Sequence, residues 1–121
     1  MNKDSILLNI PSKPDYIGLV RLASSSISNK CGLNIDEIED IKVAIGEACT
    51  NSFILSGKDN INIEFQIENE KLTIKVSDVK ANIPEELEHA RDRELGVLII
   101  RSLMDEVVFD DYGVKMTKYL V

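Results

Sequence analysis

The chain has 121 residues, which is enough for one domain with a single hydrophobic core. Apolar residues make up 44% and charged residues 29%, as is typical of a soluble globular domain. The formal net charge of −7 argues against nucleic acid as a direct partner, because phosphates are bound by Lys and Arg.

The first third of the chain predicts a strand and a helix. Residues 5–10 are apolar and β-compatible, and Pro11 ends the strand. Residues 14–30 then show apolar side chains at helical spacing, at Tyr16, Val20, Ala23 and Ile27, and Cys31-Gly32 supplies a stop.

The longest periodic segment, residues 35–56, predicts a central amphipathic helix. Asn34 is a suitable N-cap and Gly57 a suitable end. Glu47 and Asn51 are four residues apart, so they share one helix face at the edge of the apolar stripe. Both side chains can therefore lie over whatever the helix packs against.

The remaining elements include the clearest pattern in the sequence. Apolar and polar residues alternate over 61–67 and 71–76, which predicts an antiparallel hairpin with one buried and one wet face. After Pro84, residues 85–94 predict a short exposed helix, and residues 95–104 a mostly buried one in which Leu95 and Leu98 face the core. Strands over 107–109 and 114–121 complete the chain.

The predicted order is β-α-α-β-β-α-β-β. It corresponds to an α+β fold, a two-layer α/β sandwich in which a mixed, largely antiparallel sheet carries helices on one face.

Common catalytic and targeting patterns are absent. The sequence has no metal-ligand cluster, nucleophile triad or P-loop, and its one histidine, His89, lies in a charged stretch. No segment approaches the roughly 20 apolar residues of a membrane span, and the N-terminal residues lack a secretion signal. Cys31 and Cys49 form no CxxC pair, so we expect reduced thiols in a cytoplasmic protein.

Four places can carry chemistry: the Glu47/Asn51 pair, Asp78 at the end of the hairpin, Gly96, and Thr117 in the last strand. Around them the chain resembles histidine-kinase-type (GHKL) ATP-binding domains of the Bergerat fold, and most closely the bacterial anti-sigma-factor serine kinases. The matching segments are GEACTN at 46–51, VSD at 76–78, ELGVLIIRSLMDEV at 94–107 and VKMTKYL at 114–120. The resemblance covers nearly the whole chain, 1–121, as a single domain.

This resemblance implies a role for each position. Asn51 would coordinate Mg²⁺ on ATP, and Glu47 would deprotonate the attacking serine of a partner protein. Asp78 would accept a hydrogen bond from the adenine amino group, supported by Thr117. Gly96, taken as a helix-start glycine, would let the backbone approach the phosphates.

Two departures from the family pattern leave the activity open. The family's D-x-G-x-G run is replaced by Asp78 followed by Val79-Lys80-Ala81-Asn82, without glycine, and the lid is shortened to about residues 79–95. Arg93-Glu94 stand where the first glycine of the second glycine box belongs.

Three functions fit these observations to different degrees. The first is an anti-sigma factor that binds a sigma factor and phosphorylates a serine on an anti-anti-sigma protein with Mg-ATP. The alternative is a degenerate binding module on the same fold, which sequesters a regulatory partner without kinase activity. A sensor-kinase catalytic fragment is disfavoured, because no dimerisation helices with a phospho-accepting histidine accompany it.

Arg21 is the candidate partner-binding residue. It lies on the first predicted helix, off the apolar stripe, and arginine is enriched among interface hot spots. The resemblance implies that this helix belongs to the sigma-binding surface and to the interface of a homodimer.

Overall fold

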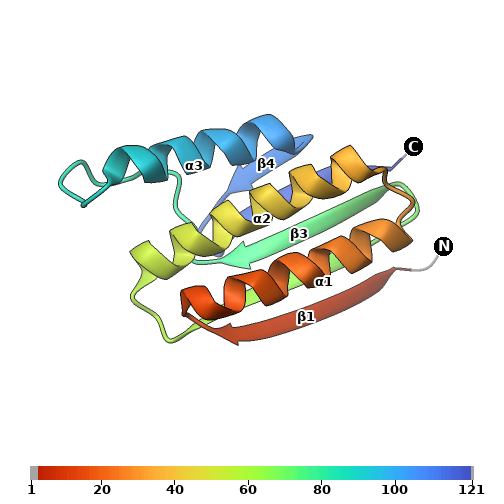
Figure 1. The fold of residues 1–121 in the computed structure, drawn as a ribbon, viewed down its shortest axis with the longest axis horizontal. Coiled ribbons are helices and arrows are strands. Elements are labelled where there is room, and N and C mark those ends of the chain that lie inside the picture. The colour runs from red at the N-terminus through yellow and green to blue at the C-terminus, as the bar shows by residue number, and fades with distance from the viewer. Residues whose placement is uncertain (1–2, 121) are drawn as a thin grey trace.

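The computed structural model, which describes residues 3–120, has two layers, a five-stranded sheet and a set of helices on one of its faces (Figure 1). The first half of the chain forms β1 (Asp4–Pro11), the short 3₁₀ turn η1 (Pro14–Tyr16), α1 (Ile17–Lys30) and α2 (Ile35–Ser56). The second half forms β2 (Asn60–Ile67), β3 (Lys71–Ser77), α3 (Ala90–Leu103), β4 (Glu106–Phe109) and β5 (Gly113–Tyr119). The predicted α+β sandwich is confirmed.

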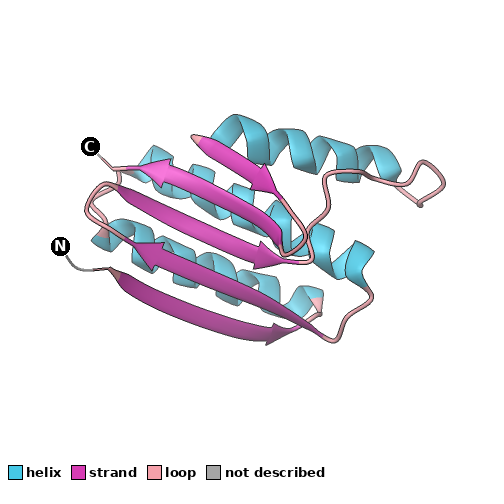
Figure 2. Ribbon diagram, turned by 180° about the vertical axis from the view of Figure 1, so that it is seen from behind, coloured by secondary structure: helices cyan, strands magenta, loops and turns pink. Residues whose placement is uncertain are grey.

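The sheet has the strand order β1-β2-β3-β5-β4, and its far face is uncovered by helices (Figure 2). Each of the four strand pairs is antiparallel, so the mixed component expected from the sequence is absent from the described residues. The end of β3 meets the start of β5, where Ser77 pairs with Gly113.

The core lies between α2 and the sheet. The buried face of α2 includes Ile41, Ala44, Ile45, Ala48 and Cys49, and the sheet contributes large side chains such as Phe65, Ile74 and Met116. Burying each large apolar side chain contributes roughly 1.5–3 kcal/mol, so this contact fixes the orientation of α2 over the sheet.

The ends of α2 lie where the sequence predicts them. Asn34 forms a capping box with Glu37: its side chain accepts from the Glu37 backbone, while the Glu37 carboxylate accepts from the Asn34 backbone. Gly57 ends the helix with a φ of 67°, a left-handed conformation that glycine adopts at low cost.

The segment before β4 differs from its prediction. One helix, α3, replaces the expected short helix over 85–94 and buried helix over 95–104. Its inner face is Gly96, Val97 and Ile100, whereas Leu95 and Leu98 are 55% and 61% exposed. The number of apolar residues overstates how much of α3 is buried, because α3 packs against α2 along a single narrow stripe.

No helix in residues 3–120 combines the length and the apolar character that crossing a bilayer requires.

Candidate functional site

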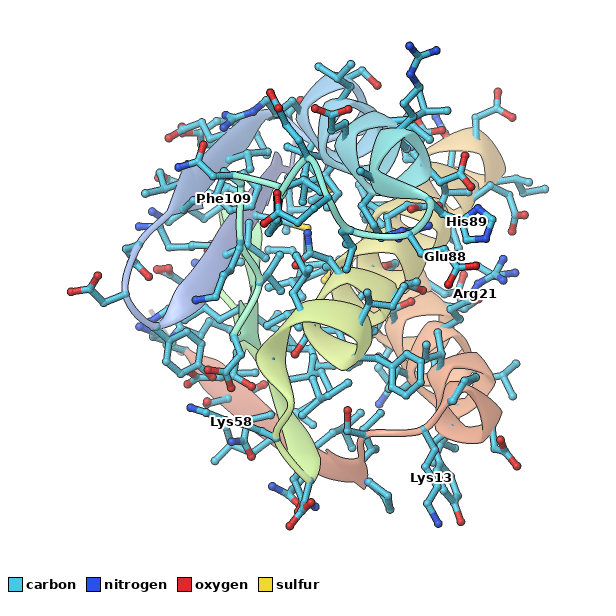
Figure 3. All side chains as sticks on the ribbon, turned by 90° about the vertical axis from the view of Figure 1, so that its left-hand side faces the viewer. Lys13, Arg21, Lys58, Glu88, His89 and Phe109 are labelled. Atoms are coloured by element: carbon cyan, nitrogen blue, oxygen red, sulfur yellow. The ribbon has the colours of Figure 1, made fainter. Side chains whose placement is uncertain are left out.

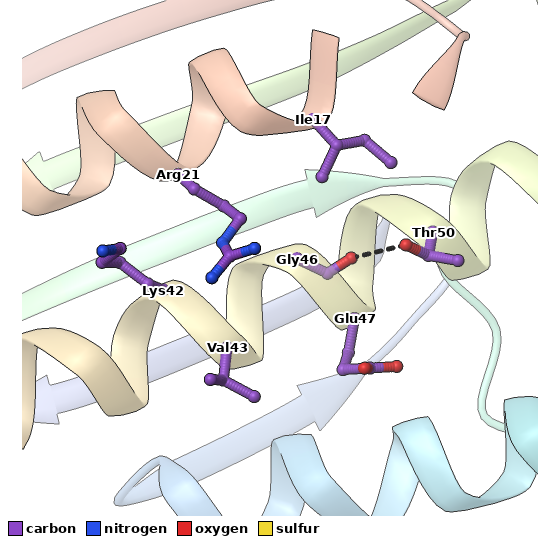
Figure 4. A pocket seen from close by; sticks show the side chains of 7 residues that line it. All are labelled: Ile17, Arg21, Lys42, Val43, Gly46, Glu47 and Thr50. Carbon is purple, nitrogen blue, oxygen red and sulfur yellow. Dashed lines mark hydrogen bonds between the residues drawn. The ribbon is translucent and has the colours of Figure 1, made fainter. Parts of the chain in front are cut away.

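The two candidate residues of α2 lie one turn apart but meet different neighbours. Asn51 is 2% exposed and faces the segment that follows β3, whereas Glu47 is partly exposed and points toward α3 (Figure 4). The site is therefore built where α2, α3 and the β3 end converge.

The Asn51 side-chain amide forms two hydrogen bonds with the backbone of one residue, Lys80. Its Nδ2 donates to the Lys80 carbonyl at 2.8 Å, and its Oδ1 accepts from the Lys80 backbone N–H at 2.9 Å. The oxygen that the resemblance assigns to Mg²⁺ is thus engaged by the chain itself. This contact could not be predicted from the sequence, because it involves the backbone of Lys80 and not its side chain.

Glu47 lies against Arg93 and Gly96 of α3. Its Oε1 is 3.5 Å from Arg93 Nη1, and a Cβ atom at Gly96 would lie 2.5 Å from the same oxygen. The Arg93 Nη1 atom is buried and has no hydrogen-bond partner among residues 3–120. Gly96 therefore provides room for the Glu47 carboxylate, and Arg93 neutralises it.

Gly96 is not at a helix start, as the sequence suggested. It is the seventh residue of α3, which begins at Ala90, so its N–H lies within the helical hydrogen-bond ladder. The helix-start position expected for Gly96 is therefore wrong, and its role at phosphates stays a prediction.

Asp78 holds the turn at the end of β3. Its φ is 60°, its backbone N–H donates to the Tyr112 carbonyl at 2.8 Å, and its Oδ1 is 2.9 Å from Lys58 Nζ. The carboxylate proposed for adenine is thus paired with a lysine, and it borders a hollow of about 340 Å³.

Thr117 does not come near Asp78. It pairs with Thr73, four residues along β5 from Gly113, which is roughly 14 Å at the rise of a strand. Val114 and Met116 belong to the core under the helices, so alternation places Thr117 on the opposite face of the sheet. This placement does not support the adenine role expected for Thr117, which stays a prediction.

Arg21 lies on the helical side of the molecule, away from the sheet (Figure 3). Its side chain extends from α1 across Gly46 of α2, and a Cβ at Gly46 would be 3.5 Å from Arg21 Cδ (Figure 4). Arg21 and Glu47 line the same groove of about 300 Å³ between α1 and α2. Arg21, the candidate partner-binding residue, and Glu47, the candidate base, lie on different helices but border the same groove.

The arranged residues do not fit Mg-ATP. The Asn51 oxygen is engaged by Lys80, the Glu47 carboxylate by Arg93, and Asp78 by Lys58. No group of three or more His, Cys, Asp or Glu side chains that could hold a metal ion occurs within residues 3–120. The sequence shows Arg93 where the family pattern has a glycine, but it does not predict that Arg93 contacts Glu47.

Comparison with known proteins places these features in context. The family model described as the histidine kinase-like ATPase domain matches residues 10–118, and this description implies ATP use within the family. Serine-protein kinase RsbW of Listeria monocytogenes serotype 4a (strain HCC23) is 36% identical, over 97% of this chain and 88% of the relative. Serine-protein kinase RsbW of Staphylococcus aureus (strain JH9) is also 36% identical, over 98% and 88%.

This chain has fewer residues than the aligned stretch of its relatives. The alignment with the Listeria protein spans 138 positions, whereas this chain has 121 residues, so at least 17 aligned positions have no residue here.

Proposed function

The chain belongs to the histidine kinase-like ATPase domain family, and we propose that it is an anti-sigma-type regulator that binds a sigma factor. We place it in the cytoplasm, as a homodimer, with an anti-anti-sigma protein as its antagonist. The observation that carries the proposal is the groove between α1 and α2 with Arg21 along its wall.

Arg21 suits a hot spot in this groove. It forms no ion pair within residues 3–120, and the groove around it includes the apolar side chains of Ile17 and Val43. An arginine bordered by apolar surface contributes most when a partner excludes water from it. An acidic or carbonyl-rich helix end of a sigma factor would supply the acceptors.

The test is capture of purified sigma factors by the wild type and by Arg21→Glu. The matched control is Lys30→Glu, which makes the same charge change at the exposed end of the same helix. Arg21→Glu should abolish capture and Lys30→Glu should preserve it. Unchanged capture by Arg21→Glu, or equal loss in both variants, would refute the proposal.

Serine phosphorylation of the anti-anti-sigma protein is the second candidate. The relatives' printed name, serine-protein kinase, favours it, and so does the opening of Glu47 onto the same groove. Two observations favour binding alone. The Asn51 amide is hydrogen-bonded to Lys80. At least 17 positions of the alignment with the Listeria protein have no residue in this chain, and we assign them to the short segment 79–95.

Transfer of label from γ-labelled ATP to purified anti-anti-sigma protein separates the two candidates. Label transferred by the wild type and lost in Glu47→Gln, but kept in the control Glu39→Gln, would establish the kinase. No transfer together with retained sigma capture would leave the binding regulator.

A further inference from the structure

The segment that follows β3 contacts Asn51, the residue to which the family pattern assigns a metal ion. We propose that Asn51 is a structural clamp on the Lys80 backbone, and that residues 78–83 thereby close the site against Mg-ATP. This inference concerns the chain alone and goes beyond the proposed sigma binding.

The first support is the completeness of the contact. The Asn51 carboxamide oxygen accepts from the Lys80 N–H at 2.9 Å, and its amino group donates to the Lys80 carbonyl at 2.8 Å, so both backbone groups of Lys80 have a partner. Asn51 is 2% exposed, so both hydrogen bonds are shielded from water. Releasing Asn51 for a ligand would break two buried hydrogen bonds at once.

The second support is that neighbouring residues hold the segment in place. Val79 is 2% exposed and belongs to the core cluster, so it draws the Lys80 backbone against α2. Asp78 fixes the start of the segment through its backbone N–H, which donates to the Tyr112 carbonyl. Residues 79–95 include no glycine that would let the chain swing away.

The third support lies on the α3 side. Arg93 Nη1 is buried at 3.5 Å from the Glu47 carboxylate. In a nucleotide site of the family pattern a glycine would stand here and leave space for phosphates. The guanidinium fills that space and compensates the Glu47 charge within the chain.

Amide hydrogen exchange tests the clamp directly. The Lys80 N–H should be protected in the wild type and should exchange at least about 10-fold faster in Asn51→Ala, because its acceptor is removed. Asn82→Ala is the control, since Asn82 is an exposed asparagine of the same segment. Equal exchange in the wild type and Asn51→Ala would overturn the clamp.

Titration with Mg-ATP tests the closure. We expect no change in melting temperature at millimolar Mg-ATP for the wild type. A rise that disappears in Asn51→Ala, or one that depends on Arg93, would overturn the inference, since either result means that nucleotide enters the site.

If Asn51→Ala does not fold, the Asn51→Asp variant tests the clamp in its place. The carboxylate keeps the acceptor for Lys80 N–H but places an oxygen against the Lys80 carbonyl. A clamp predicts a lower melting temperature for Asn51→Asp that Mg²⁺ does not restore, whereas a metal ligand predicts restoration by Mg²⁺. None of these measurements uses a sigma factor, so a failed sigma capture leaves their outcome intact.

Discussion

Replacing Gly96 by alanine should change the free energy of unfolding by less than about 1 kcal/mol, although a Cβ there would lie 2.5 Å from Glu47 Oε1. The contacted atom ends a flexible side chain that borders an open groove, so the carboxylate can rotate away. Helix propensity favours alanine over glycine by about 1 kcal/mol. The Arg93 and Glu47 side chains are 15% and 27% exposed, so weakening their contact costs about 1 kcal/mol, and the two terms nearly cancel.

Gly113→Ala is the matched control. Gly113 has a φ of 153°, which side chains rarely adopt, and an added Cβ would collide with the Val76 carbonyl and lie 2.8 Å from the Asp78 backbone nitrogen. Backbone atoms of paired strands cannot rotate aside, so we expect a loss of about 2–4 kcal/mol.

Urea denaturation followed by circular dichroism measures both variants, with unfolding free energies taken by linear extrapolation. A loss above about 2 kcal/mol for Gly96→Ala would show that the Glu47 carboxylate is held rigidly, and would refute the reasoning. A loss below about 1 kcal/mol for Gly113→Ala would contradict the assumed rigidity of the strand pair.

Three further predictions concern the thiols and the β3 end. Ellman's reagent at pH 8 should modify Cys31 in the native protein and Cys49 only after denaturation, because burial raises the pKa of Cys49 to about 12; two rapidly reacting thiols would contradict this. Since that pKa lies above its ordinary value of 9.0, the associated stability is complete below pH 9 and is lost as pH rises toward about 12. Denaturation between these pH values should show a flatter loss for Cys49→Ala, and an unchanged slope would argue against this cause. Asp78→Asn should change stability by less than about 0.5 kcal/mol in urea denaturation, because its partner Lys58 is largely exposed and Asn tolerates positive φ; a loss several times larger would show that the ion pair sets the turn.

Much of the fold could be predicted because its local patterns agree with its tertiary packing. The central helix has a capping box at Asn34, a glycine at its end and a continuous apolar stripe, all of which act within the segment. The hairpin of β2 and β3 follows from strict alternation. The helix α3 was harder to predict, because its exposed Leu95 and Leu98 are indistinguishable from core residues without knowledge of its neighbours.

The site could be predicted only in part, because the partners of its residues come from distant segments. The spacing of Glu47 and Asn51 predicted a shared helix face. Only the tertiary structure shows that Glu47 contacts Arg93 and that Asn51 contacts the Lys80 backbone. The face of Thr117, in contrast, was available from the sequence. Thr117 is an odd number of residues away from Val114 and Met116, and side chains alternate between the two faces of a strand. Thr117 therefore points away from the helices.

The clamp changes what the presence of Asn51 implies about activity. By the family pattern, Asn51 together with Glu47 points to a kinase, because a pure binding module has no use for a metal ligand. The two hydrogen bonds to the Lys80 backbone are a structural reason for asparagine at position 51, since any apolar replacement leaves the Lys80 N–H and carbonyl without these partners. Asn51 is therefore compatible with a protein that binds no nucleotide. Glu47, which borders the Arg21 groove, is the residue whose substitution separates phosphorylation from binding.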